Sequence, residues 1–218
     1  AGDPDAFVTK EEVADYLVAY AAQIKAPVRT GVAVERVERM AGKPGFRVTT
    51  SQGVIEAQSV IAATGAFQAA AIPPMVPESA GVAQIHSSAY RNPGQLAPGA
   101  VLVIGAGSSG VQIADELLQS ERKVYLAVGP HDRPPRSYRG RDFVWWLGVL
   151  MKWDADANPL SEHTTIAVSG AHGGHTVDFR KLAARGMVLV GRATGYAGGK
   201  MSFASDLVAN VTAGDENY

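Results

Sequence analysis

The stretch Val101-Leu102-Val103-Ile104-Gly105-Ala106-Gly107-Ser108-Ser109-Gly110 decides the fold. Its four apolar residues predict a buried parallel strand, and its glycines have the spacing G-x-G-x-x-G. Apolar residues then recur at helical spacing from Val111 to Leu118, and a second strand is expected over Lys123 to Val128. This order predicts an α/β protein with a Rossmann-like, three-layer domain that binds NAD(P).

Each glycine of the turn has a mechanical task in such a site. Gly105 allows the tight turn, Gly107 lets a pyrophosphate approach the backbone, and Gly110 lets helix and strand pack closely. The helix that follows faces the phosphates with free N–H groups, and the hydroxyls of Ser108 and Ser109 can add donors. The alternative is a glycine turn that serves packing alone.

The end of the second strand indicates which nucleotide is bound. NAD enzymes usually place a carboxylate there, whereas this chain has Val128-Gly129-Pro130. The residues that follow include Arg133, Arg136 and Arg139, which suit a 2′-phosphate. NADPH is therefore favoured over NADH. The alternative is a solvated basic loop, and Asp132 could still bind a ribose hydroxyl.

The N-terminal part has a different pattern. Thr9 and Glu12 form a predicted capping box, and an apolar stripe from Val13 to Ile24 predicts a helix that packs on a core. An antiparallel β meander is expected next, with strands at Val34–Val37, Phe46–Thr50, Val54–Ala57 and Val60–Ala63. The proline-rich stretch after it indicates a linker.

The order of three segments resembles one protein family. Ala63-Thr64-Gly65 comes first, then Ile85-His86-Ser87-Ser88-Ala89-Tyr90-Arg91-Asn92-Pro93, then the glycine turn. This order resembles the class B flavin-dependent monooxygenases, in particular a bacterial group similar to flavin-containing monooxygenases. The resemblance implies a partial FAD-binding domain at 1–70, a linker at 71–97, an NADPH-binding Rossmann domain at 98–205 and the start of a return to the FAD domain at 206–218.

The resemblance also assigns roles to individual residues. Thr64 and Gly65 would lie near the flavin side of the hinge, and the backbone of Val34 would meet the flavin adenine. His86 and Tyr90 belong to the family's histidine-bearing signature, which is altered here because Gly81 lies five residues before the histidine. His86 would orient a cofactor or transfer a proton; a purely structural role is the alternative.

The resemblance implies that NADPH reduces FAD in an intact parent enzyme, which then activates oxygen. The family's first glycine fingerprint and its closing FAD segment are expected outside these residues, so the chain is expected to be a fragment. No side chain is assigned as catalytic. The alternatives are a pyridine-nucleotide disulfide reductase and a non-catalytic NADPH-binding module. The substrate is a small molecule that the sequence does not identify.

The composition of the chain argues against several classes of binding partner. The chain of 218 residues has 20 basic and 21 acidic residues, so no net field favours nucleic acid or an anionic membrane. It has no cysteine and no apolar run long enough to insert into a membrane, and a cytoplasmic protein is expected. An exposed FAD-domain surface would favour homo-oligomers. A metal site at His163, His172 and His175 is not expected, and the three tryptophans are expected to pack in a core or interface rather than line a substrate channel.

Overall fold

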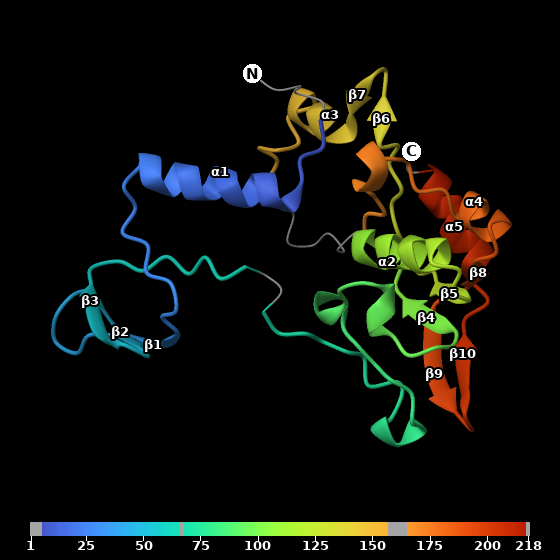
Figure 1. Cartoon of the computed structure of the whole chain (residues 1–218), viewed down its shortest axis with the longest axis horizontal. Coiled ribbons are helices and arrows are strands. Elements are labelled where there is room, and N and C mark those ends of the chain that lie inside the picture. Colours follow the sequence, from blue (N-terminus) through green and yellow to red (C-terminus); the bar gives the residue numbers. More distant parts are fainter. Residues whose placement is uncertain (1–5, 66–67, 157–164, 217–218) are drawn as a thin grey trace. The chain divides into compact units, whose positions relative to one another are not determined.

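The computed structural model describes residues 6–65, 68–156 and 165–216 and shows a mixed α/β protein (Figure 1). The chain divides into two compact units. Val8–Ala69 forms the first, here called the N-terminal unit, and Ala1–Phe7 with Ala70–Tyr218 forms the second, here called the C-terminal unit. The predicted α/β class is confirmed.

The N-terminal unit consists of one helix and one small sheet. Helix α1 spans Lys10–Gln23, and its capping box is formed as predicted: the Glu12 amide donates to Thr9 Oγ1 over 3.2 Å, and the Thr9 amide donates to Glu12 Oε2 over 2.7 Å. The sheet is an antiparallel meander in the order β1-β2-β3, formed by Val34–Arg39, Phe46–Thr50 and Gly53–Ala57. The predicted meander is therefore confirmed over three strands.

Two expectations for this unit are wrong. The fourth strand, Val60–Ala63, is not formed, and Ile61 is 90% exposed there. A strand needs a neighbour for its backbone N–H and C=O groups, and no described strand pairs with this segment. The apolar stripe of α1 was expected in a core, yet no residue of this helix is buried in the described part of the chain.

The C-terminal unit contains the predicted strand–helix–strand order. Strands β4 (Val101–Ile104), β5 (Val124–Ala127) and β8 (Val188–Val190) form a parallel sheet in the order β4-β5-β8. Helix α2 (Ser108–Gln119) connects β4 to β5 and buries Val111, Ala114 and Leu117. Because β5 is the central strand, it is the most deeply buried of the three.

The core of this unit joins residues that lie far apart in the sequence. Helix α4 (Phe179–Ala184) contributes Phe179, and helix α5 (Leu207–Glu216) packs Leu207 and Val211 against the same cluster. Tyr90 and Leu96, from the stretch expected to be a linker, also pack on it. The remaining elements are η1 (Glu78–Ala80), η2 (Ser87–Ala89), η3 (Pro93–Gln95), β6 (Ser137–Tyr138), β7 (Arg141–Asp142), α3 (Phe143–Val149), η4 (Ala171–Gly173), β9 (Ala193–Ala197) and β10 (Lys200–Phe203).

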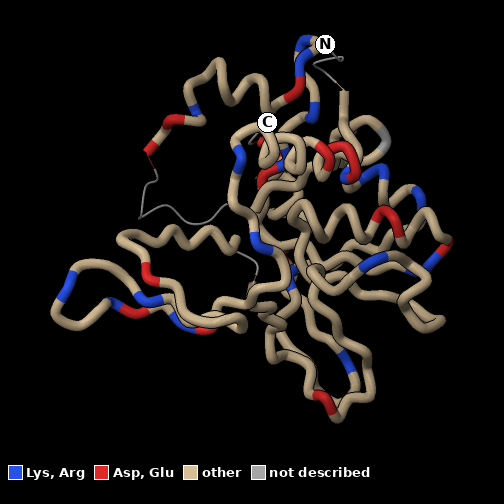
Figure 2. The backbone as a smooth tube through the Cα atoms, turned by 60° about the vertical axis from the view of Figure 1, so that its left-hand side comes forward, with Lys and Arg blue, Asp and Glu red and all other residues tan. Residues whose placement is uncertain are grey.

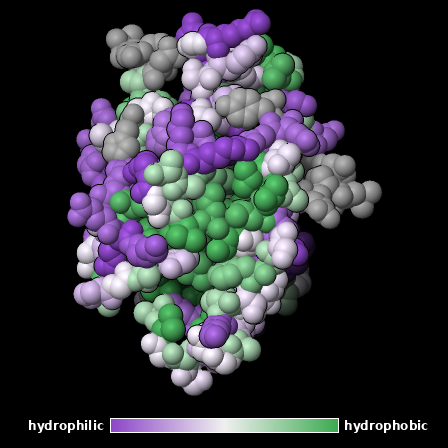
Figure 3. Space-filling view, turned by 90° about the vertical axis from the view of Figure 1, so that its right-hand side faces the viewer, coloured by the Kyte–Doolittle hydropathy of each residue, from purple (hydrophilic) through white to green (hydrophobic). Residues whose placement is uncertain are grey.

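The surface is mixed in character. Basic and acidic residues are interspersed along the backbone rather than gathered in two regions (Figure 2). On the side that carries β9, β10 and α5, apolar side chains gather between hydrophilic ones (Figure 3). Among the described residues, none of the helices has the length and apolar character needed to cross a membrane.

Candidate dinucleotide site

The glycine turn joins β4 to α2 with the geometry that its sequence predicts. Gly105 has a φ of +105°, a conformation that L side chains rarely adopt, and its amide donates to the Ala127 carbonyl over 3.1 Å. At Gly110, a Cβ atom would lie only 1.9 Å from the Gly105 carbonyl oxygen. The first glycine therefore makes the turn, and the third lets α2 begin directly against it.

The space beside Gly107, where a phosphate would bind, is occupied by another part of the chain. A Cβ atom at Gly107 would lie 2.7 Å from Cγ2 of Thr165. The Ser108 hydroxyl donates to the Ile166 carbonyl over 2.7 Å, whereas Ser109 is exposed. No local sequence pattern predicts that residues 165–166 lie here, because they follow the glycine turn by more than fifty positions.

The residues that directly follow β5 are Val128, Gly129 and Pro130. None of them is acidic, as predicted. His131 is buried there, with Nδ1 2.9 Å from the Gly129 carbonyl oxygen and its ring edge-on to Phe179 at 4.9 Å. Burial lowers the pKa of His131, because the charged imidazolium would lose its hydration. The backbone of Asp132 bonds with the same distant segment that covers Gly107, through its amide to Thr165 and through its carbonyl to Ala167.

The three predicted phosphate-binding arginines differ in their surroundings. Arg133 is 3% exposed; its guanidinium pairs with Asp215, donates to the Val177 carbonyl over 3.3 Å and lies 5.4 Å from the Phe179 ring centre. Nε of Arg136 lies 2.7 Å from Asp142 Oδ2. Arg133 and Arg136 thus each have a carboxylate partner within the chain, and their contact with a phosphate stays a prediction.

Arg139 is the exposed member of the three. It has a φ of +49° in the turn between β6 and β7, and its guanidinium lies 5.2 Å from the Tyr138 ring centre. Figure 1 shows this hairpin well separated from the turn between β4 and α2, at the end of the segment that follows β5. Next to it, Trp146 donates to the Tyr138 carbonyl over 2.9 Å, and Trp145 remains exposed.

The signature histidine caps a short helix. His86 Nδ1 accepts from the Ser88 amide at 3.2 Å and lies 2.9 Å from the Ser88 hydroxyl. Tyr90 donates to Glu116 of α2 over 2.9 Å; burial and this carboxylate raise the pKa of the Tyr90 hydroxyl. Glu116 lies two turns beyond the N-terminus of α2, so the signature segment is tied to the far half of this helix.

The predicted flavin-side residues lie in the N-terminal unit. Val34 begins β1 and is 61% exposed. Thr64 and Gly65 are exposed, Gly65 has a φ of +79°, and the Thr64 carbonyl accepts from the Gln68 side chain. Their proposed contacts with FAD stay predictions.

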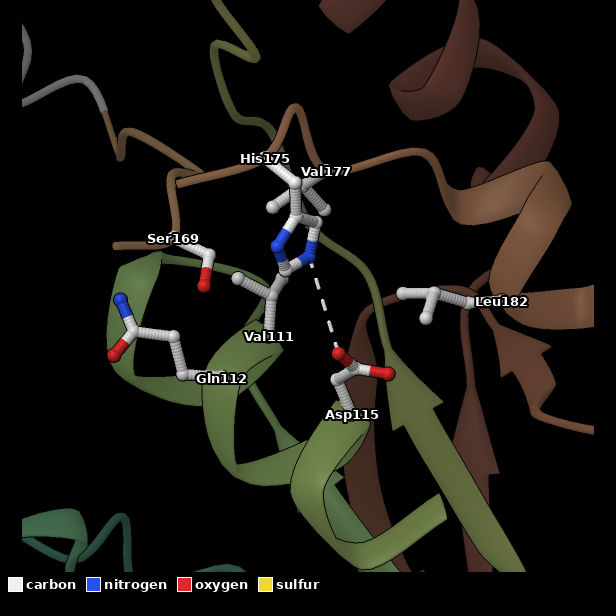
Figure 4. Close-up of a pocket in the computed structure, with 7 residues that line it drawn as sticks. All are labelled: Val111, Gln112, Asp115, Ser169, His175, Val177 and Leu182. Carbon is white, nitrogen blue, oxygen red and sulfur yellow. Dashed lines mark ion pairs between the residues drawn. The ribbon is translucent and has the colours of Figure 1, made fainter. Parts of the chain in front are cut away.

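A small cavity lies between α2 and the segment 169–177 (Figure 4). Its volume is about 20 Å³, room for one water molecule. Asp115 Oδ1 accepts from Arg185 over 2.7 Å, and Asp115 Oδ2 lies 3.9 Å from His175 Nε2. This pair does not extend to a metal site: the described residues contain no group of three His, Cys, Asp or Glu suited to a metal ion, and His163 lies outside them.

Comparison with known proteins identifies the family. The sequence pattern of the pyridine nucleotide-disulphide oxidoreductases matches residues 4–147. The chain belongs to this family. Among family relatives, an oxidoreductase of Geobacillus kaustophilus named CzcO-like is 43% identical over 154 residues, which are 68% of this chain and 43% of the relative. CzcO of Bacillus subtilis is 36% identical over 154 residues, 68% of this chain and 44% of the relative.

Monooxygenases are also among the relatives of this chain. The flavin-containing monooxygenase iboF of Amanita muscaria is 32% identical over 132 residues, 57% of this chain and 24% of that protein. A mutant flavin monooxygenase from Stenotrophomonas maltophilia has the same fold, with a TM-score of 0.64 and 24% identity over 94% of this chain and 54% of that one. The resemblance to flavin-containing monooxygenases is thus confirmed at the level of the family. The chain spans less than half the length of the CzcO relatives.

Proposed function

We propose that this chain supplies the NADPH-binding part of an FAD-dependent monooxygenase. The observation that carries the proposal is the turn between β4 and α2, in which Gly105 has a φ of +105° and Gly110 lies against the Gly105 carbonyl. A parallel strand, this turn and a helix N-terminus together form the seat that dinucleotide pyrophosphates use in Rossmann units.

The residues of this chain would position the nucleotide rather than react with it. The first amides of α2 would donate to the pyrophosphate, and Gly129 at the end of β5 would leave room for a 2′-phosphate where NAD enzymes carry a carboxylate. A flavin bound by the longer parent protein would accept the hydride from NADPH and activate oxygen. Arg139 remains the exposed arginine proposed for the 2′-phosphate.

The monooxygenase proposal is preferred to a disulfide reductase for a chemical reason. The chain has no cysteine, so these 218 residues hold no dithiol that could exchange electrons with flavin. The monooxygenase names among the relatives support the same choice. A non-catalytic NADPH-binding module would bind the nucleotide equally well, and tight retention of FAD by the longer protein would distinguish the two.

Calorimetric titration with NADPH and with NADH tests the proposal. We expect binding of NADPH that is tighter than binding of NADH. Ser109→Glu should abolish binding, because its carboxylate would repel the pyrophosphate while favouring the helix dipole and so preserving the fold. Ser109→Ala is the matched control and should bind nearly as the wild type does. No binding of either nucleotide would contradict the proposal.

A second variant tests the choice of nucleotide. A Cβ atom at Gly129 would meet no atom within 4 Å, so Gly129→Asp can place a carboxylate at the end of β5 with no clash at its Cβ. This variant should lose the preference for NADPH, because the carboxylate repels a 2′-phosphate and can bind the ribose hydroxyls of NADH. An unchanged preference would show that the end of β5 does not contact the ribose.

A further inference from the structure

Residues 165–168, here called the strap, run beside the glycine turn. The strap is joined to the segment after β5 as a short parallel pairing, in which Asp132 and Ile166 are partners. The Asp132 amide donates to the Thr165 carbonyl over 2.7 Å, and the Ala167 amide donates to the Asp132 carbonyl over 2.8 Å. Two backbone hydrogen bonds thus fix the strap on one side.

Two side chains of α2 hold the strap on its other side. The Ser108 hydroxyl donates to the Ile166 carbonyl over 2.7 Å, and Gln112 Nε2 donates to the Val168 carbonyl over 2.9 Å. These residues are one turn apart, so they form a row along the first part of the helix. Figure 4 shows Gln112 on α2 near Ser169, the residue that follows the strap.

The position of Thr165 gives the strap its significance. In dinucleotide folds the second glycine of the fingerprint is bare because the pyrophosphate approaches its backbone. The direction in which a side chain of Gly107 would point is therefore the direction from which a phosphate arrives. The Thr165 methyl group lies in that direction, 2.7 Å from the place of the missing Cβ.

We propose that the strap closes the pyrophosphate seat and has to move away from Gly107 before a nicotinamide dinucleotide can bind. This proposal rests on the proposed function, since it concerns the same site. The closed strap also occupies the Ser108 hydroxyl, so opening releases a hydrogen-bond donor for a phosphate oxygen. The apparent affinity for the nucleotide is then reduced by the fraction of molecules in which the strap is open.

Variants that loosen the strap should bind NADPH more tightly. Gln112→Leu keeps the size of the side chain and removes one hydrogen bond to the strap. One such bond shifts the equilibrium about fivefold, so the dissociation constant for NADPH should fall by about that factor. Thr165→Ser removes the methyl group that faces Gly107 and should also tighten binding. Thr165→Val keeps this methyl group and should bind as the wild type does.

Chemical labelling follows the strap independently of affinity. Because the chain has no cysteine, Thr165→Cys introduces its only thiol. In the closed state the thiol faces Gly107, so its reaction with 5,5′-dithiobis(2-nitrobenzoate) should be slow. NADPH should accelerate labelling, and adding Gln112→Leu should accelerate it about fivefold without nucleotide. Protection of the thiol by NADPH would overturn the proposal, because the strap would then be a fixed wall of the occupied site.

The two proposals fail in different ways. Equal NADPH affinity in the wild type, Gln112→Leu and Thr165→Ser would overturn the strap proposal and leave the proposed function standing. Absence of binding in all three, with labelling of Thr165→Cys unaffected by NADPH, would overturn the proposed function and the strap's role with it. Tighter binding in both loosened variants, together with accelerated labelling, would support both.

Discussion

Helices α1 and α2 both carry apolar residues, but these gather on one face much more strongly in α2, and the two helices have opposite environments. Helix α2 buries Val111, Ala114 and Leu117 under the parallel sheet, whereas α1 has no buried residue, and its Tyr16 and Leu17 are 66% and 57% exposed. Both helices are formed, and α1 has the better N-terminal cap. Helix formation thus depends on local pattern and capping, whereas burial depends on what the rest of the molecule provides.

The largest effect is expected from truncation of a buried leucine of α2. Leu117 is fully buried in the core, so Leu117→Ala should destabilise the C-terminal unit by about 3 kcal/mol. All three tryptophans lie in this unit, and their fluorescence reports its unfolding in urea. A loss below about 1 kcal/mol would show that this core is looser than the structure indicates.

The next effect concerns two arginines that share one carboxylate. Arg133 and Arg180 both pair with Asp215, but their side chains are 4% and 61% exposed. Arg133→Met should cost about 2 kcal/mol, because Asp215 loses its buried partner while remaining partly hydrated. Arg180→Met is the matched control and should cost about 0.5 kcal/mol or less, as exposed ion pairs do. Equal losses would contradict the burial of Arg133.

A pH dependence that arises from His131 should belong to the C-terminal unit, in which this residue lies. Burial lowers the pKa of His131 in the folded state, so the stability that its neutral form contributes is complete above a pH of about 6.5. It is lost as the pH falls through the lowered pKa. His131→Gln should therefore show a shallower loss of stability at acid pH, by at most about 1.4 kcal/mol per pH unit. Urea unfolding at several pH values measures this slope, and parallel slopes would contradict it.

The smallest effect is expected on α1. Leu17→Ala lies on the exposed stripe and should change stability by no more than about 0.5 kcal/mol. Circular dichroism during urea unfolding measures it, with Leu117→Ala as the buried counterpart. A loss of about 2 kcal/mol would mean that the stripe is covered in solution, for example by a second copy of the chain. Repeating the measurement at several protein concentrations would detect such association.

The sequence predicts those parts of the fold that depend on neighbouring residues. Strand β4, the turn at Gly105 and the capping box at Thr9 are correct because apolar runs, glycine spacing and capping pairs act over a few positions. The strand at Val60–Ala63 is wrong because a strand also needs a partner, which a local pattern does not supply.

The candidate site is predicted less completely for the same reason. The glycine turn is visible in the sequence, whereas the position of Thr165 against Gly107 depends on a segment that returns from far along the chain. The charge of Arg133 suggests a phosphate ligand, but its pairing with Asp215 depends on where α5 packs. The cofactor contacts of Val34, Thr64, Gly65 and His86 rest on the family resemblance and stay predictions.

Helix α5 has a consequence for how the protein is made. Its Asn210 side chain donates to the Val128 carbonyl over 3.0 Å, across 82 positions of the chain, and Asp215 reaches Arg133 over a similar span. The contacts made by the residues that follow β5 are therefore complete only after α5 has left the ribosome. During synthesis Arg133 and His131 stay uncovered until α5 emerges, so nascent chains would be a substrate for chaperones up to that point.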